Sequence, residues 1–439
     1  MNDAAAAHGL ADVLARQRRR VVAHVARSLG LAHLALAEDA VQTASLRALQ
    51  SWPQQGVPAN PAGWLYRVAR HAAIDALRAE QREVPLAPAG DGDGDDDEFA
   101  ASATEATALH AVPAAEGRFA GELDDDELAL LFAACQPRLP VATQVALALR
   151  ALAGLPLAEI ASAMFTPESA LAQRLSRARV ELAGQPMLLP AGHELAPRRD
   201  AVLTALMLMF HSGMVASGRQ GDAPAGVLAR REALSLCWEA IRLARAVAAH
   251  PCTAHGDADA LAALLLLHGA RLTGRLDERG DIVPLHGQPR DRWDGGMVRA
   301  GFMHLQRAQR AQRLSRWHVQ AGIAAEHARA PEHAATDWAA IVAYYEELLL
   351  LEPTAAPRLG HAVALAEAGA PDRSLVLLRA LQADAPVALR AHTWAAMARA
   401  HERLGERGDA DACLRQAIAA AAHPADARLL GRHLANLSA

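Results

Sequence analysis

The chain has 439 residues, more than one compact core of ordinary size holds, so its length predicts two or more domains. Hydrophobic residues make up 52% of the sequence but aromatic residues only 4%, and this balance predicts an all-α fold in which helices pack through small side chains. The net charge of −5 excludes a uniformly basic nucleic-acid-binding surface, so any contact with DNA must come from a local patch.

The first helical block covers residues 1–83. One helix opens at 36–42 and is expected to end near Trp52, where the Pro- and Gly-containing segment 52–58 predicts a turn. A second helix begins after Asn60, a good N-cap residue that precedes a proline. Its helical projection predicts a buried side made of Leu65, Val68, Ala69, Ala72 and Ala76, opposite a stripe made of Arg67, His71, Asp75, Arg78 and Arg82. A charged helix beside Trp64 suits single-stranded DNA, although this pattern taken alone favours an ordinary solvated face.

Residues 84–126 differ in character from both neighbouring blocks. They contain prolines, the acidic run 91–98 and few large apolar side chains. Such a segment cannot bury enough surface to offset the entropy of ordering it. The sequence therefore predicts a flexible acidic linker here.

Helical periodicity returns in residues 127–184, and the segment 154–179 reads as a helix, a short turn and a second helix. Thr166 is expected to be the N-cap of the second helix, with Pro167 at its first position. The projection places Leu171, Leu175, Ala178 and Leu182 on a packed stripe, Ser169, Gln173, Ser176 and Arg177 on the opposite face, and Arg174 and Arg179 at the flanks. This pattern predicts a DNA-binding helix-turn-helix in which the flanking arginines hold phosphates. An ordinary amphipathic helical hairpin is the alternative.

Residues 185–439 form a long helical extension. Within it Gly369 and Gly405 each follow an Ala-rich helix and precede another, at an offset of 36 residues. This offset is close to the tetratricopeptide period of about 34 residues. It predicts tetratricopeptide-like repeats near 336–436, with a degenerate first unit containing Trp338, Tyr345 and Pro353. Plain helical-hairpin packing remains an open alternative.

Two of these blocks resemble a known family. Segments 37–42 and 60–70 resemble sigma region 2, whereas 159–161 and 174–179 resemble sigma region 4, and their order and linker match extracytoplasmic-function (ECF) RNA polymerase sigma factors. The resemblance implies that region 2 binds the β′ clamp of core RNA polymerase and captures a flipped base of the -10 element, and that region 4 meets the β flap and reads the -35 element. The implied polymerase-binding residues are Glu38, Asp39 and Gln42. The implied -10 residues are Asn60, Trp64, Arg67, Arg70, His71 and Arg78, and the implied -35 residues are Ser169, Gln173, Arg174, Ser176, Arg177 and Arg179.

The extension also carries a resemblance. Segments 131–137, 268–271, 290–294 and 336–338, together with the repeats, resemble the ECF subgroup that has a tetratricopeptide-like C-terminal extension. This resemblance implies a promoter-specific initiation factor whose extension regulates it or binds a protein partner.

Other functions were weighed against this one. His250, Cys252 and His255 are the tightest cluster of metal-ligand types, but they lie in a loop without a second ligand pair, so we expect no metal, no cofactor and no enzyme. A repeat scaffold would leave the first two blocks unexplained, and the main alternative is a helix-turn-helix regulator with a tetratricopeptide-like sensor domain that does not bind core polymerase. Widely spaced cysteines and the lack of a signal-peptide pattern or a membrane-spanning stretch fit a cytoplasmic protein without membrane contact.

Overall fold

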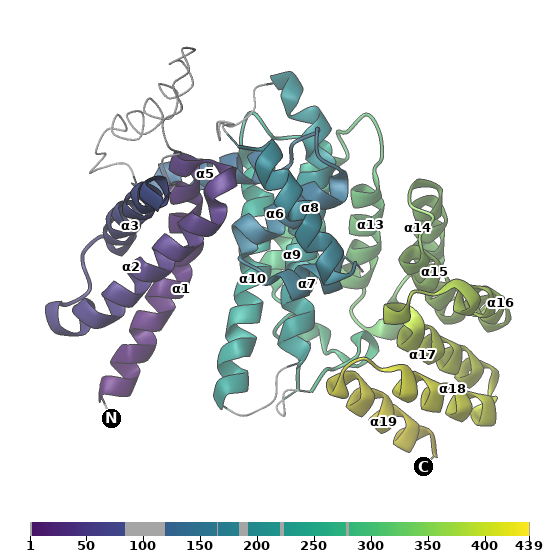
Figure 1. Cartoon of the computed structure of the whole chain (residues 1–439). Helices are drawn as coiled ribbons and strands as arrows, with labels where there is room; N and C mark the ends of the chain where they lie inside the picture. The colour runs from purple at the N-terminus through teal and green to yellow at the C-terminus, as the bar shows by residue number, and fades with distance from the viewer. Residues whose placement is uncertain are drawn as a thin grey trace. The chain divides into compact units, whose positions relative to one another are not determined.

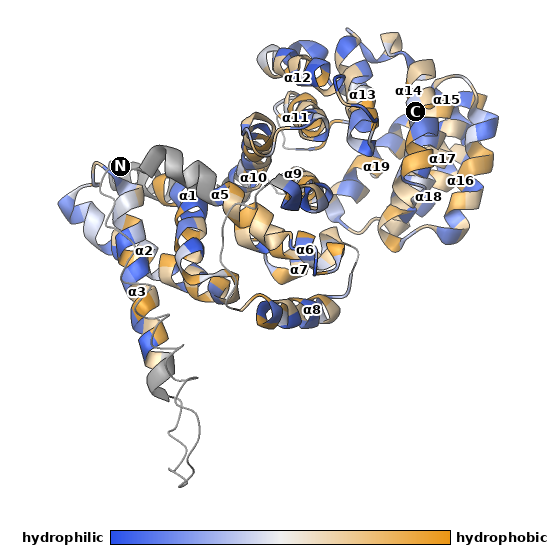
Figure 2. Ribbon diagram, turned by 90° about the horizontal axis from the view of Figure 1, so that it is seen from above, coloured by the Kyte–Doolittle hydropathy of each residue, from blue (hydrophilic) through white to orange (hydrophobic). Residues whose placement is uncertain are grey.

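The computed structural model describes residues 2–83, 119–164, 166–183, 192–219, 224–277 and 281–438. Within these residues every regular element is helical, apart from one isolated bridge between Leu276 and Ile282, so the predicted all-α fold is confirmed. The chain divides into two compact units, Met1–Ala205 and Leu206–Ala439. Figure 2 shows hydrophobic and hydrophilic residues alternating along individual helices of both units, as amphipathic packing requires.

The first unit begins with three helices that pack on one another (Figure 1). They are α1 (Asn2–Leu29), α2 (Leu34–Gln55) and α3 (Pro61–Glu83), with the short turn η1 (Leu31–His33) between the first two. Their shared core contains Val21, Val25, Ala37, Val41, Leu65 and Ala69, all nearly inaccessible to solvent. The turn begins later than predicted, after Gln55 and not at Trp52. Helix α2 continues through Pro53 to Gln55 and ends at Gly56, whose φ of 83° is a left-handed value that suits glycine.

The second part of the first unit holds the predicted helix-turn-helix. The elements in order are α5 (Phe119–Ala134), α6 (Val141–Ala148), the short π-helical turn η2 (Leu149–Ala153), α7 (Leu157–Ala163) and α8 (Glu168–Glu181). Helix α5 packs on α1, so both parts share one compact unit. Most of the predicted linker lies outside the described residues, but its last segment, 119–126, is helical and not a linker.

The second unit is built from consecutive helices joined by short connections. Helix α9 (Arg199–Arg219) enters it, and then follow α10 (Pro224–Ala249), α11 (Gly256–Gly269), α12 (Gly295–Ala308) and α13 (Arg316–Arg329). Between α11 and α12 the chain forms the short turns η5 (Leu285–Gly287) and η6 (Arg290–Arg292). Among the described residues, one apolar segment, Ala196–Gly218, is long enough to cross a membrane, but more than half of its most apolar stretch is buried inside the protein, as expected of a core helix.

The C-terminal helices form a row in which each packs against the next (Figure 1). After η7 (His333–Ala335) they are α14 (Trp338–Leu351), α15 (Ala355–Glu367), α16 (Pro371–Asp384), α17 (Val387–Leu404), α18 (Arg407–Ala420) and α19 (Pro424–Ser438). Gly369 and Gly405 end α15 and α17 with φ of 89° and 79°. Positions 36 residues apart have the same environment, since the pairs Ser374 and Ala410, Leu378 and Leu414, and Leu381 and Ala417 are all buried.

Close packing within this row needs small residues at defined points. A Cβ atom at Gly360 of α15 would lie 2.5 Å from the ring of Tyr345 in α14. Glycine is therefore required for these two helices to approach as they do. Burial raises the pKa of Tyr345, in keeping with its place between the helices.

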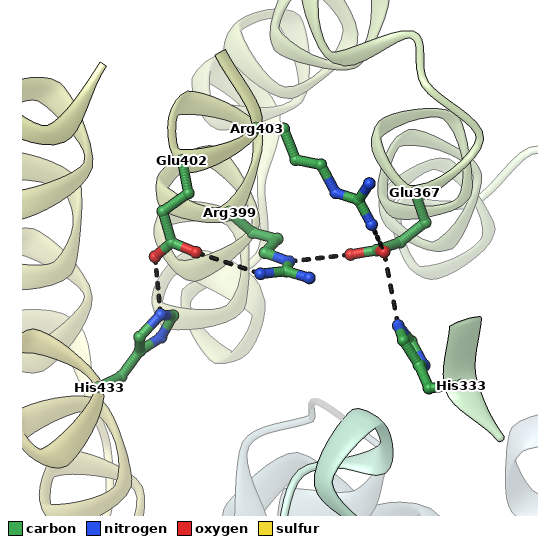
Figure 3. Close-up of polar contacts among 6 residues, drawn as sticks. All are labelled: His333, Glu367, Arg399, Glu402, Arg403 and His433. Atoms are coloured by element: carbon green, nitrogen blue, oxygen red, sulfur yellow. Dashed lines mark hydrogen bonds and ion pairs between the residues drawn. The ribbon is translucent and has the colours of Figure 1, made fainter. Parts of the chain in front are cut away.

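A polar network joins α15, α17 and α19 of the row with η7, whose His333 lies 3.4 Å from Glu367 (Figure 3). The carboxylate of Glu367, only 6% exposed, pairs with Arg399 at 2.9 Å and with Arg403, while Glu402 accepts hydrogen bonds from Arg399 at 3.3 Å and from His433 at 2.7 Å. Burial raises the pKa of Glu367, but the hydrogen bonds and charges of the two arginines outweigh it, so the pKa lies below its ordinary value. The network thus depends on an ionised carboxylate.

Candidate polymerase and nucleic-acid interface

The exposed face of α2 contains two of the three residues predicted to bind polymerase. Asp39 and Gln42 are exposed, one turn apart on the helix surface. Two leucines continue the same stripe at i+7 and i+10. Leu46 is 54% exposed and Leu49 is 45% exposed, although large apolar side chains usually avoid water.

Sequence reasoning missed the two leucines, because the sequence alone does not tell which apolar residues of a helix are left uncovered. Their spacing relative to Asp39 was the available signal. An exposed stripe of two leucines with two polar residues at its end is suited to burial against a protein partner. We refer to Asp39, Gln42, Leu46 and Leu49 as the α2 stripe.

The third predicted polymerase-binding residue, Glu38, is already paired inside the unit. Its Oε2 atom accepts a hydrogen bond from Arg150 at 2.9 Å, and its side chain is only 15% exposed. Arg150 lies in η2, where the π-helical turn ends at Gly154 with a left-handed φ of 61°. In this conformation the Glu38 carboxylate is therefore occupied by the second part of the unit.

The residues predicted to meet the -10 element line α3 and its start. Asn60 caps the helix, since its Oδ1 atom accepts a hydrogen bond from Gly63 N–H at 2.9 Å, which confirms the predicted cap. Trp64 is half-buried and its ring packs edge-on against that of Trp52, with centroids 5.3 Å apart. This contact holds the indole in a fixed position at the start of the helix.

Further along α3 the predicted charged stripe faces solvent. Arg67, His71 and Arg78 are exposed and Arg70 is half-buried. The predicted buried side is correct for Leu65 and Ala69, but Ala73 is fully buried where Ala72 was expected. The reason is geometric, because Ala73 follows Ala69 by four residues and so lies almost directly above it.

Helices α7 and α8 form the predicted helix-turn-helix. The two helices pack against each other, and Ile160 of α7 and Leu171 and Ala178 of α8 are buried. The predicted cap is wrong by one residue: Pro167 is the N-cap, with an extended backbone, and Thr166 instead donates its N–H to the Ala161 carbonyl at 2.9 Å. This bond closes the turn after α7, so the threonine belongs to the turn and the helix starts at Glu168.

The outer face of α8 carries the residues predicted to read DNA. Ser169, Gln173, Ser176 and Arg177 are exposed, and Arg174 is half-buried. Arg177 makes only a long contact, 3.4 Å from its Nε atom to the Gln173 carbonyl. Exposed serine, glutamine and arginine side chains offer the donors and acceptors that base edges in a major groove require.

Arg179 differs from the other residues of this face. It is exposed, but its Nε atom lies 3.4 Å from the carbonyl oxygen of Ala32 in η1. The end of α8 is thus joined to the start of the α2 region. Arg150 and Arg179 together link the two predicted regions, and neither link was visible in the sequence.

A buried arginine that the sequence did not single out completes the first unit. Arg198, 7% exposed, donates hydrogen bonds to the Phe132 carbonyl at 2.9 Å, to Gln136 Oε1 at 3.0 Å and to the Glu194 carbonyl at 3.1 Å. Burial lowers the pKa of Arg198, and the nearby Glu194 partly offsets this. Residues beyond 184 therefore hold α5 in place.

The cluster weighed as a metal site has a local role. His250 Nδ1 accepts a hydrogen bond from Cys252 N–H at 3.3 Å. His255 is the N-cap of α11, where its Nδ1 atom accepts from Ala258 N–H at 3.0 Å. All four cysteines are free thiols, as expected.

Comparison with known proteins agrees with this geometry. Residues 14–83 match the family model of sigma-70 region 2, residues 130–182 match that of sigma-70 region 4, and residues 198–309 match a family of unknown function, DUF6596. The chain is 36% identical over 356 residues to an uncharacterised protein of Rhizobium meliloti (strain 1021), which covers 80% of this chain and 78% of that protein. No solved structure matches the chain.

Proposed function

Because this chain belongs to the sigma-70 family, as an ECF-like sigma factor with a C-terminal extension, we propose that it binds core RNA polymerase and directs initiation at specific promoters. Its sigma-70 domains point to a non-enzymatic transcription factor, and we propose a cytoplasmic location. Glu38, Asp39 and Gln42 are proposed to meet the β′ clamp. The face of α8 is proposed to read the -35 element, and the α3 face with Trp64 to meet the -10 element.

The observation that supports the proposal is that one compact unit has two different exposed faces. The α2 stripe combines uncovered leucines with polar residues, as a protein-binding surface does, while α8 exposes side chains suited to base edges. A regulator that binds DNA alone would need the second face but not the first. This difference supports a sigma factor over a helix-turn-helix regulator that acts without core polymerase.

Co-purification with core polymerase tests the proposal. The full-length protein should co-elute with core polymerase on size-exclusion chromatography and support specific transcripts in vitro from genomic fragments. Core polymerase without the protein is the control. Binding of promoter fragments by the free protein without any association with core polymerase would contradict the proposal and support the alternative regulator.

We further propose that the extension regulates the sigma core in cis or binds a protein partner through its tetratricopeptide-like helix row. The row supports this because Leu350, Val376 and Val387 are large apolar residues that are 79%, 64% and 72% exposed. The test compares transcription from one cognate promoter by the full chain and by a truncation ending at Ala205, the last residue of the first unit. A change in output, with circular dichroism showing that the truncated protein is folded, supports regulation in cis. Equal transcription by the full chain and the truncation, both in vitro and in cells, contradicts regulation in cis.

A further inference from the structure

Segments that promoter recognition does not use meet in the second unit. They are residues 268–271 at the end of α11, residues 290–294 around η6, and residues 336–338 at the start of α14. A hydrogen bond of 2.9 Å from Asp294 N–H to the Ala270 carbonyl holds the second segment against the first. These segments contribute an unusual set of buried polar groups.

The Arg290 guanidinium and the Nε atom of Arg271 are buried without an acceptor among the described residues. All three nitrogen atoms of Arg290 and the Nε atom of Arg271 are shielded from solvent and make no hydrogen bond. Arg290 instead lies over the ring of Trp293, with its central carbon 4.2 Å from the ring centroid. Burial, followed by the charges of Arg275 and Arg290, lowers the pKa of Arg271 to about 10. Burying a cation without a counter-ion is costly.

Other buried groups of the second unit also lack a hydrogen-bond partner. Trp293 stacks with Arg290, and His327 is within electrostatic range of both arginines. The ring of His327 packs against that of Trp338, two residues after Thr336, at 5.3 Å. The indole Nε1 of Trp293, the hydroxyl of Thr336 and the Nδ1 of His327 are all buried and have no partner in the described chain. Burial lowers the pKa of His327 to about 4, and the charges of Arg290 and Arg271 contribute to this. His327 is therefore neutral near pH 7 and lies within electrostatic range of the two arginines. All of these side chains can donate, and none is a carboxylate.

Glu367, the acid that contacts His333, is already paired with arginines. His333, whose ring packs against that of Trp338 at 5.2 Å, lies 3.4 Å from Glu367 (Figure 3). Glu367 is held by Arg399 and Arg403, as described above. Its charge is thus balanced within the helix row, and it does not neutralise Arg271 or Arg290.

We propose that Arg271, Arg290, Trp293, His327 and Thr336 form a binding site for a phosphate group, either free or carried by a small molecule. Arginine forks and neutral donors bind the oxygens of such an anion. Two buried cations balance a doubly charged tetrahedral anion better than a carboxylate, which brings one charge and two oxygens. The site lies outside the promoter-binding segments, and its occupancy is measured without polymerase or DNA, so its test is independent of the proposed function.

The experiment uses the full-length protein with inorganic phosphate at constant ionic strength. Thermal unfolding measures the stabilisation by phosphate, and isothermal titration calorimetry measures the affinity. A ligand that binds only the folded state raises the midpoint of unfolding. We expect a saturable rise with phosphate and with sulfate, which is also a doubly charged tetrahedral anion, and none with acetate. A phosphomonoester such as glycerol 3-phosphate distinguishes the two sources, since tighter binding of the ester indicates a carried phosphate and tighter binding of inorganic phosphate indicates the free ion.

Arg290→Gln and Arg271→Gln are the test variants, and Arg292→Gln, which changes an exposed arginine of the same turn, is the matched control. Each test variant should weaken phosphate binding at least about tenfold, because it removes charge-assisted hydrogen bonds. Without phosphate each should unfold at a higher temperature than the unmodified protein, because an uncompensated charge is gone, whereas loss of a merely structural arginine would lower the midpoint.

Three results would overturn the proposal. The first is no saturable response to phosphate. The second is a response that Arg290→Gln retains in full, which would indicate a general salt effect. The third is an equal response to acetate, which would mean that a carboxylate is the bound group.

Discussion

At the scale of single residues, two arginines of α8 are expected to contribute differently to promoter binding. Arg177 is fully on the outer face, whereas Arg174 is half-buried at its edge. Arg177→Ala should cost about 1–3 kcal/mol and change the preference at one base pair of the -35 element, because a base-edge contact carries sequence information. Arg174→Ala should weaken binding to all DNA sequences alike. It should also reduce the slope of log affinity against log salt concentration by about one, because one phosphate contact is lost.

Fluorescence anisotropy with -35 fragments over a range of salt concentrations separates the two effects. Arg379→Ala, which changes an exposed arginine in the extension, is the control. If neither α8 substitution changes the affinity for any fragment, then α8 does not read DNA.

The pair between Arg150 and Glu38 leads to a second prediction. If Glu38 meets core polymerase, its carboxylate must first leave Arg150, so Arg150→Ala should increase the affinity for core polymerase. The pair is partly exposed, with Arg150 at 37%, so the stability lost should be about 1 kcal/mol or less. Surface plasmon resonance with immobilised core polymerase measures the affinity. A lower affinity in Arg150→Ala would mean that the pair supports the binding conformation instead of competing with it.

At the scale of elements, the α2 stripe is expected to be a protein-binding surface. Replacing Leu46 and Leu49 together by serine should weaken binding to core polymerase at least about tenfold, because a fully buried leucine contributes about 1.5–3 kcal/mol. Stability should change little, since both side chains already face water. Replacing Leu350 and Leu351, two exposed leucines of α14, by serine is the matched control. Unchanged co-elution of the α2 variant with core polymerase would show that this face has another partner or none.

The network around Glu367 joins elements of the helix row, and it predicts a pH-dependent contribution to stability. The pKa of this carboxyl in the folded protein lies below the ordinary value of 4.5. The network therefore contributes fully above pH 4.5, and the contribution is lost as the pH falls through the folded-state pKa. Glu367→Gln should cost about 2 kcal/mol at pH 7.

Thermal unfolding at pH 7 and below pH 4 measures this effect, and the difference between Glu367→Gln and the unmodified protein should shrink at the lower pH. Asp411→Asn is the control, since its pair with Arg415 is a surface pair within one helix and should contribute only about 0.3–0.5 kcal/mol. A difference that is the same at both pH values would exclude an ionised carboxylate as the source.

At the scale of the whole molecule, the first unit is expected to need the residues up to Ala205. Leu195 and Arg198 are buried, and Arg198 binds the carbonyl of Phe132. A truncation ending at residue 184 should unfold at a lower temperature than one ending at Ala205, by an amount corresponding to about 2 kcal/mol or more. Circular dichroism melts compare the two proteins directly. Equal midpoints would show that the helix-turn-helix does not depend on the segment after it.

Local pattern was enough to predict much of this protein. The exposed faces of α3 and α8, the Asn60 cap and the equivalence of Gly369 and Gly405 follow from helical periodicity and from the preferences of single residues. These features depend on neighbours within one or two turns, so the sequence itself contains the information. Boundaries were less accurate, as at Trp52 and Thr166, because competing hydrogen bonds near a helix end differ little in energy.

Only the tertiary structure decided which distant side chains meet. Glu38 and Arg150 are 112 positions apart, and Arg271, Arg290 and His327 come from three separate elements whose approach depends on how whole helices pack. The exposure of Leu46 and Leu49 is also a tertiary property, because it depends on which helix faces are covered. Which side chains meet across a core depends on the summed energy of many small contacts. A local sequence pattern does not predict that energy.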